Sequence, residues 1–294
     1  VNYIIMRPYQ LIMALLSKSK YLLGIQCPKY FWVAMRQPER LPEADMTLQY
    51  RFDQGHLVGA LAKKLFPEGI DIPEGDFKNN LILSRQLLEK KKPLFEFAIS
   101  DGEVYSRADI LSPVGDEWDI IEVKSSTSVK EVNIHDLSFQ KYCYEKCGLK
   151  IRKCFLLYVN NQFVKEGDVD PKKFFTKEEV TTQVDLLLPS VEENVQRMFK
   201  VMGDYECPSV KISRNCADPY DCPLEDECWG FLPESSVFDL YRGGKKSFQL
   251  FEDGVLALKD IPSDYKLTDK QNIQHRCEQN DEIHVDKEKI KNFL

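Results

Sequence analysis

Apolar and polar residues alternate most regularly over residues 105–124, where the sequence reads YSRADILSPVGDEWDIIEVK. Ser, Pro, Gly and Asp between residues 112 and 117 break the alternation and predict a turn. The pattern therefore predicts two β-strands that form a hairpin.

Side chains alternate between the two faces of a strand, so Glu122 and Lys124 are expected on the same face. Pairing about the midpoint of the turn places Asp109 across from Ile120 and diagonal to Glu122. Apolar neighbours are expected on the opposite, core-facing side: Ala108, Ile110, Ile121 and Val123. Two carboxylates and one ammonium then converge beside apolar strands, and diagonal neighbours about 7–8 Å apart are within the reach of one divalent cation.

Periodic patterns predict further elements on both sides of this hairpin. Helical periodicity predicts helices over residues 47–66, 77–91, 134–146, 180–202 and 286–294. Alternating or continuous apolar runs predict strands over residues 94–100, 103–111 and 151–160. This order of helices, hairpin strands, crossover helix and strand is typical of an α/β protein with a mixed sheet flanked by helices.

Composition limits the class of protein further. A chain of 294 residues that is 43% hydrophobic can bury one large core or two smaller ones. Its net charge of −7 argues against a generic nucleic-acid coat protein, although local basic patches can still contact phosphates. Nine cysteines without a secretory signal indicate a reducing, cytoplasmic setting and metal ligation rather than disulfides. The apolar run at residues 11–16 is too short to span a membrane.

The carboxylates of the hairpin suit a hard divalent cation. Isolated carboxylates beside apolar strands resist ionisation, and Mg²⁺ or Mn²⁺ removes that problem by binding their oxygens. Such a cation can polarise a phosphoryl oxygen, while a nearby lysine positions or activates the attacking water. The alternative is a surface hairpin that carries an ordinary Glu–Lys pair.

Asp109, followed after twelve residues by Glu122-Val123-Lys124, resembles the core of the PD-(D/E)XK nucleases. More narrowly, it resembles their RecB-type branch, including the iron–sulfur CRISPR-associated exonucleases and bacterial proteins with this module N-terminal to a second domain. The similarity covers residues 17–229 and implies a restriction-endonuclease-like fold. It further implies that Asp109, Glu122 and Lys124 are catalytic, and that Asp109, Glu122 and the Val123 carbonyl hold Mg²⁺ or Mn²⁺.

The same resemblance assigns roles on neighbouring helices. It makes His56, in a Gly-His context, a further metal ligand, although a lone helical histidine is commonly structural. Gly55 and Gly59 beside it would allow the helix to approach the sheet closely. Gln140 and Tyr144 share a helical face and match the Q-x-x-x-Y motif that lines the DNA path in the family; the alternative for Tyr144 is ordinary core packing. Glu96 is a weaker site candidate, whose alternative is a charge on an edge strand.

Three cysteines recur as C-x5-C-x5-C in a proline-interrupted stretch: Cys216, Cys222 and Cys228. With Cys27 they supply the four thiolates that a [4Fe–4S] cluster requires. The resemblance favours this cluster, which would close the module between its two ends, over zinc, whose sites have closer cysteine pairs. Cys207 is an alternative fourth ligand. Cys27 alone could equally be a small buried apolar residue.

The predicted organisation has three parts. Residues 1–16 are expected to be an N-terminal extension, with Met13 as a more natural start, residues 17–230 the nuclease module, and residues 231–294 a connector or the beginning of a further domain. The implied function is metal-dependent hydrolysis of DNA, on single strands or ends, with a helicase or a CRISPR or defence protein as a possible partner. The alternative is a non-catalytic nucleic-acid-binding or scaffold module that retains the fold.

Overall fold

The computed structural model describes residues 15–43, 46–73 and 75–293, and its contacts divide the chain into two compact units between Ser209 and Val210. The boundary expected after residue 230 therefore lies inside the second unit. The proposed extension over residues 1–16 and its alternative start at Met13 lie almost wholly outside the described residues. Within the described residues, no helix is long and apolar enough to cross a membrane.

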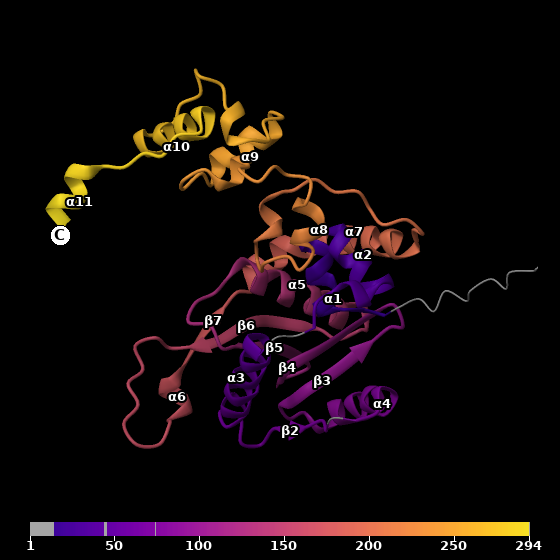
Figure 1. The fold of residues 1–294 in the computed structure, drawn as a ribbon. Helices are drawn as coiled ribbons and strands as arrows, with labels where there is room; N and C mark the ends of the chain where they lie inside the picture. Colours follow the sequence, from indigo (N-terminus) through magenta and orange to yellow (C-terminus); the bar gives the residue numbers. More distant parts are fainter. Residues whose placement is uncertain (1–14, 44–45, 74, 294) are drawn as a thin grey trace, which may run out of the picture. The chain divides into compact units, whose positions relative to one another are not determined.

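A seven-stranded mixed sheet forms the centre of the first unit in the described part of the chain (Figure 1). Six strands lie in the order β2 (Ile70–Asp71), β3 (Leu94–Ser100), β4 (Val104–Val114), β5 (Glu117–Lys124), β6 (Ile151–Val159) and β7 (Phe175–Glu179). The short β1 (Leu16–Ser17) pairs in parallel with β4. Parallel pairing of β5 with β6 and antiparallel pairing of β3, β4 and β5 confirm the mixed α/β sheet predicted from the sequence.

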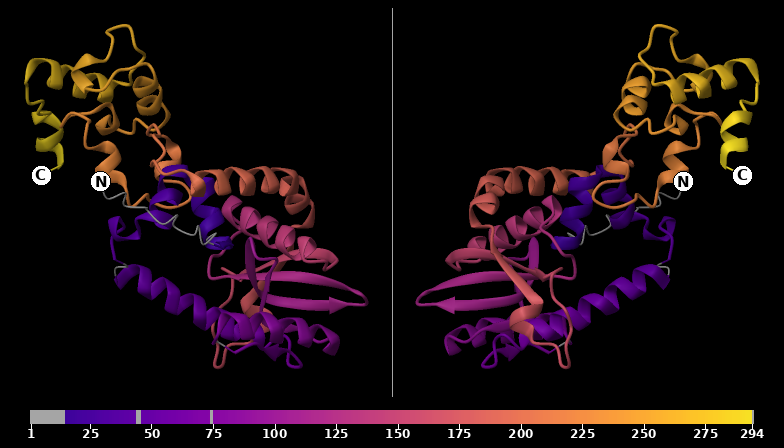
Figure 2. Two further views of the ribbon diagram at one scale, coloured as in Figure 1. Left: turned by 90° about the vertical axis from the view of Figure 1, so that its right-hand side faces the viewer. Right: turned by 90° about the vertical axis from the view of Figure 1, so that its left-hand side faces the viewer.

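Helices cover both faces of this sheet. Figure 2 shows α5 (Glu131–Lys146) and α7 (Thr181–Gly203) on one face and α3 (Met46–Lys63) on the other. The first face also receives α1 (Lys18–Gln26) and α2 (Pro28–Arg36), while α4 (Phe77–Leu87) packs against β3. The short α6 (Pro171–Phe174) leads into β7. Two apolar cores result, a large one under α1, α5 and α7 and a smaller one under α3.

The regular pairing of β3 with β4 is interrupted at Glu96 on β3 and Asp109 on β4. These residues oppose each other between the regular pairs Phe95↔Ile110 and Phe97↔Ala108, and Glu96 has a left-handed backbone with φ of 58°. The alternation of faces shifts here, because Ala108 packs in the large core whereas Ile110 packs in the small one. Ala108 and Ile110 were expected on one face, and the structure corrects that expectation. An irregularity of this kind changes the direction in which side chains point, here those of the acidic residues Glu96 and Asp109.

The register of the hairpin also differs from the predicted one. Leu111 pairs with Ile120 and Ile110 with Ile121, so Asp109 is not across from Ile120 as expected. The pairing of β4 with β5 ends at Ile110↔Ile121. Nearer its N-terminal end, β4 pairs with β1 instead. Because α1 begins directly after β1, its first residue, Lys18, is placed beside the opening between β4 and β5.

The second unit is built from short helices around a small core of its own. These are α8 (Glu225–Trp229), α9 (Lys245–Glu252), α10 (Asp269–Asn280) and α11 (Lys287–Phe293). Buried apolar side chains form the core: Val237, Leu240, Leu250, Leu258 and Ile261. The stretch expected to be a connector or the beginning of a further domain thus includes packed structure, and α11 matches the predicted terminal helix.

Candidate active site

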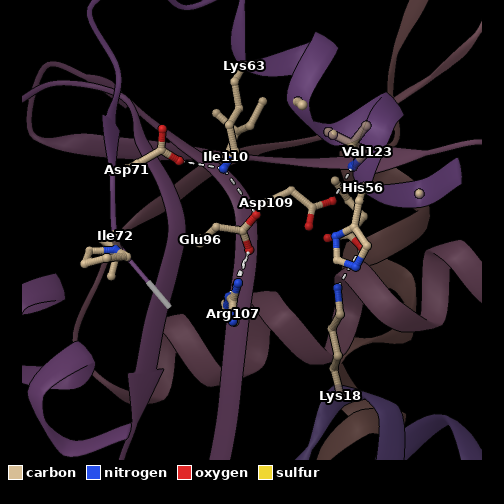
Figure 3. A pocket seen from close by; sticks show the side chains of 15 residues that line it. Lys18, His56, Lys63, Asp71, Ile72, Glu96, Arg107, Asp109, Ile110 and Val123 are labelled. Atoms are coloured by element: carbon tan, nitrogen blue, oxygen red, sulfur yellow. Dashed lines mark hydrogen bonds and ion pairs between the residues drawn. The ribbon is translucent and has the colours of Figure 1, made fainter. Parts of the chain in front are cut away.

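A cavity of about 660 Å³ opens between α3 and the separated strands β4 and β5. Its lining includes His56, Asp109, Glu122 and Val123, the four residues expected to bind a metal (Figure 3). Lys124 is not part of the lining, but its Nζ lies 2.7 Å from Glu122 Oε1. The structure therefore brings together the side chains that the sequence pattern singled out, although the register that does so differs from the predicted one.

Asp109 spans the opening between the two strands. Its Oδ2 accepts a hydrogen bond of 2.7 Å from the backbone N–H of Val123, as the dashed line in Figure 3 marks. β4 no longer pairs with β5 at this point, so the carboxylate satisfies an N–H that would otherwise lack a partner on this side. Asp109 is thereby fixed against the strand that carries Glu122 and Lys124.

Glu122 lies at the centre of a buried group of charges and is 2% exposed. Its Oε1 accepts from Lys18 Nζ and Lys124 Nζ, both at 2.7 Å, and its Oε2 accepts from Gln140 Nε2 at 2.7 Å. Lys124 also lies 2.7 Å from Asp136 Oδ2, so this ammonium is held between two carboxylates. The geometry fixes Lys124 in one position beside the cavity.

Charge balance in this group sets the protonation states. Burial, and then the neighbouring Asp109 and Asp136, raise the pKa of Glu122. Burial alone would lower the pKa of Lys124, but Asp136, Glu122 and Asp109 outweigh it and raise that pKa well above its usual value. Lys124 is therefore a stable cation here, which favours positioning of water or phosphate over proton abstraction.

Two members of the group, Lys18 and Asp136, were not identified from the sequence. Burial opposes the ionisation of Asp136, yet Lys124 and Lys18 outweigh it and lower its pKa. Asp136 lies one helical turn before Gln140, whose Nε2 donates to it at 2.9 Å. The spacing of four residues from Asp136 to Gln140 was a visible signal for a shared helical face. For Lys18 no local signal existed, because only the pairing of β1 with β4 brings it to the site.

The structure places Gln140 and Tyr144, for which a DNA-contacting role was expected, in the interior of the first unit. Both side chains are fully buried, with no exposed surface. Gln140 donates to Glu122 and Asp136 and so orients their carboxylates. The hydroxyl of Tyr144 accepts from Ala108 N at 3.0 Å and donates to Phe97 O at 2.8 Å, which fastens β3 to β4.

His56 is exposed on α3 and lines the cavity, as expected. The neighbouring Gly55 and Gly59 do not serve close packing, because a Cβ added at either position would meet no atom within 4 Å. The two glycines leave the cavity open on the side of α3. This corrects the prediction that they allow the helix to approach the sheet closely.

The donors around the cavity have the chemistry that a hard divalent cation requires. Asp109 and Glu122 supply carboxylate oxygens to the cavity lining. Gln140, outside this lining, has a buried Oε1 with no hydrogen-bond partner among the described residues. Because both Nε2 donors of Gln140 face carboxylates, that Oε1 is an acceptor aimed elsewhere. No three His, Cys, Asp or Glu side chains of residues 15–43, 46–73 and 75–293 are already grouped as metal ligands.

The cysteines expected to ligate iron are divided between the two units. Cys27 lies in the first unit at the junction of α1 and α2, whereas Cys216, Cys222 and Cys228 lie in the second. The N–H of Cys222 donates to the carbonyl of Cys216 at 2.7 Å, which closes part of the loop. No disulfide joins two cysteines among the described residues. The rival ligand Cys207 is half-buried in the first unit.

No family model matches the chain, and no curated protein matches it. Among solved structures, it is similar to an alkaline exonuclease (LHK-Exo) from Laribacter hongkongensis, at 12% identity and a TM-score of 0.31 over 65% of this chain and 89% of that one. LHK-Exo in complex with dAMP gives 14% identity and a TM-score of 0.30 over the same shares. TM-scores this low do not establish a shared fold, so the functional proposal rests on the geometry of the cavity.

Proposed function

We propose that the protein is a metal-dependent DNA nuclease that hydrolyses phosphodiester bonds in the cavity between α3 and the separated strands. The observation that carries the proposal is the convergence of Asp109, Glu122 and His56 on one cavity, with Lys124 fixed beside Glu122. Carboxylates beside a fixed ammonium are the residue types that metal-assisted phosphoryl chemistry uses.

Each residue has a distinct part in the proposed reaction. Asp109, Glu122, His56 and the Val123 carbonyl would hold Mg²⁺ or Mn²⁺, which supplies polarisation of the phosphoryl oxygen and a more acidic bound water. Lys124, a cation held by Glu122 and Asp136, orients the attacking water and the phosphate. Gln140 keeps the Glu122 carboxylate in position. The substrates would be DNA single strands or ends.

Digestion of labelled single-stranded and double-stranded DNA with Mg²⁺ or Mn²⁺ tests this function. Wild-type protein should cleave only when the metal is present, and Lys124→Ala should lose most of the cleavage because the ordered cation is gone. Lys153→Ala is a matched control, since Lys153 pairs with Glu179 on β7 outside the cavity. Equal cleavage by wild type and Lys124→Ala would contradict the proposal, and absence of cleavage by all proteins would favour the non-catalytic binding module.

We also propose that Cys27, Cys216, Cys222 and Cys228 bind a [4Fe–4S] cluster with a structural role. Support comes from three thiols on one short, proline-interrupted loop and from the soft donor chemistry of four thiolates. The described residues of either unit hold no ready-made group of ligands, so the loop would have to close around the cluster. Metal binding of this kind contributes directly to folding stability.

Anaerobic purification followed by iron and sulfide analysis tests the cluster. Wild-type protein should contain about four iron and four sulfide per chain, and Cys222→Ser should lose both, together with its visible absorbance and part of its melting temperature. Cys277→Ser, on α10, is the control and should retain them. Zinc without sulfide in the wild type, or an unchanged Cys222→Ser protein, would overturn the proposal.

A further inference from the structure

The wall of the cavity beside the carboxylates carries two cations to which the proposed hydrolysis assigns no role. Lys63, at the end of α3, and Arg107, on β4, both line the cavity. Their side chains are 28% and 36% exposed, so a ligand in the cavity can reach them. Figure 3 shows both side chains directed at Glu96, which comes from β3.

Glu96 holds the two cations together. Arg107 donates to Glu96 Oε2 through Nε at 2.9 Å, and its Nη2 lies 2.8 Å from the same oxygen. Lys63 Nζ lies 3.5 Å from Glu96 Oε1 and also pairs with Asp71. One carboxylate therefore fixes an ammonium and a guanidinium at a defined separation on the cavity wall.

Glu96 has a left-handed backbone, which a residue other than glycine rarely adopts. Backbone strain of this kind clusters at functional sites. The strain coincides with the irregularity opposite Asp109, which aims both acidic residues at one cavity.

We propose that Lys63 and Arg107 form a phosphate-binding subsite that receives the backbone phosphate next to the scissile bond. This inference rests on the proposed nuclease function and names how the same cavity engages its substrate. The guanidinium of Arg107 lines the cavity and is partly exposed, and its planar set of N–H donors matches the geometry of a phosphate. Lys63 adds a second positive charge, and Glu96 keeps both cations in place when no nucleic acid is bound.

The test is equilibrium binding of a fluorescein-labelled single-stranded DNA oligonucleotide in EDTA, where no hydrolysis occurs, across a series of salt concentrations. Each phosphate contact on a single strand contributes about 0.7 to the slope of log K against log salt. Arg107→Gln and Lys63→Gln should each bind more weakly and lower the magnitude of that slope by about 0.7. Arg107→Lys keeps the charge and should restore the wild-type slope.

Arg152→Gln is the matched control. Arg152 also pairs with an acidic residue on a neighbouring strand, donating to Asp119 at 3.0 and 2.6 Å, but it lies outside the cavity lining. It should bind DNA with the wild-type slope. Wild-type slopes for both Arg107→Gln and Lys63→Gln would overturn the subsite, as would an equal loss in Arg152→Gln. The binding assay contains no metal, so its result does not depend on hydrolysis. If the variants keep the wild-type slope while the wild-type protein still cleaves DNA, the subsite fails and the nuclease proposal stands. If the variants lose slope but the wild-type protein does not cleave DNA, the subsite stands and the nuclease proposal fails.

Discussion

The hydroxyl of Tyr144 shows how a single buried residue prepares the candidate site. It lies between Ala108 N and Phe97 O, next to the position where Glu96 and Asp109 interrupt the ladder between β3 and β4. By accepting from one strand and donating to the other, it satisfies two buried backbone groups at the irregularity. Its burial raises its pKa well above the usual value, so it remains neutral and able to donate.

Tyr144→Phe should therefore destabilise the protein. The substitution leaves the ring in place but removes the partner of two buried backbone groups, at a cost of about 1–3 kcal/mol. Urea denaturation measures the change. Tyr142→Phe, on the same helix, should change stability by less than about 0.5 kcal/mol, because the Tyr142 hydroxyl has no hydrogen bond with a described residue. Equal effects of the two substitutions would show that the hydroxyl does not fasten the strands.

At the same scale, the sequence identified the acidic residues and the lysine of the site but not all their partners. Asp109, Glu122 and Lys124 could be found because their spacing on a hairpin is a local signal. Lys18 could not, because a pairing between β1 and β4 brings it to Glu122 from far away in the chain. The burial of Gln140 was also hidden, since periodicity gives a shared helical face but not what that face packs against.

Helix α3 forms one wall of the cavity, and its glycines keep that wall open. A Cβ added at Gly59 would meet no atom within 4 Å, whereas one added at Gly24 on α1 would lie 2.5 Å from Met198 Cε on α7. Two helical glycines thus have opposite functions. Gly24 permits close packing of α1 against α7, and Gly59 leaves space beside His56.

The two glycines should respond oppositely to the same substitution. Gly59→Ala should stabilise the protein by about 0.5–1 kcal/mol, because alanine in a helix interior loses less backbone entropy than glycine. Gly24→Ala should destabilise it, because the new methyl overlaps the buried Met198. Urea denaturation of both variants provides the comparison. A loss of stability in Gly59→Ala would show that the space beside α3 is not open.

The order of elements was predictable, but their register was not. Helical and strand periodicity located α3, α5, α7 and the central strands to within a few residues. Periodicity does not encode where two strands stop pairing, and the left-handed Glu96 that shifts the faces of β3 has no sequence signature such as glycine. The hairpin was therefore predicted with the wrong partner for Asp109, although its carboxylate still reaches the strand of Glu122.

At the scale of the molecule, the chain consists of two compact units, and the residues with proposed functions are divided unequally between them. The first contains the sheet, the cavity and every residue of the proposed catalytic group, and the second contains three of the four proposed iron ligands. Local spacing identified the cysteine loop, but the division after Ser209 could not be predicted, because it depends on contacts between distant segments.

Binding of Mn²⁺ tests the central claim, that the cavity of the first unit assembles a metal site from Asp109 and Glu122. Titration of the full chain with Mn²⁺, followed by electron paramagnetic resonance of the free ion, should show binding to wild-type protein. That binding should be lost in Asp109→Asn and retained in Asp119→Asn, whose acidic residue pairs with Arg152 outside the cavity lining. Equal Mn²⁺ binding by wild type and Asp109→Asn would contradict the account.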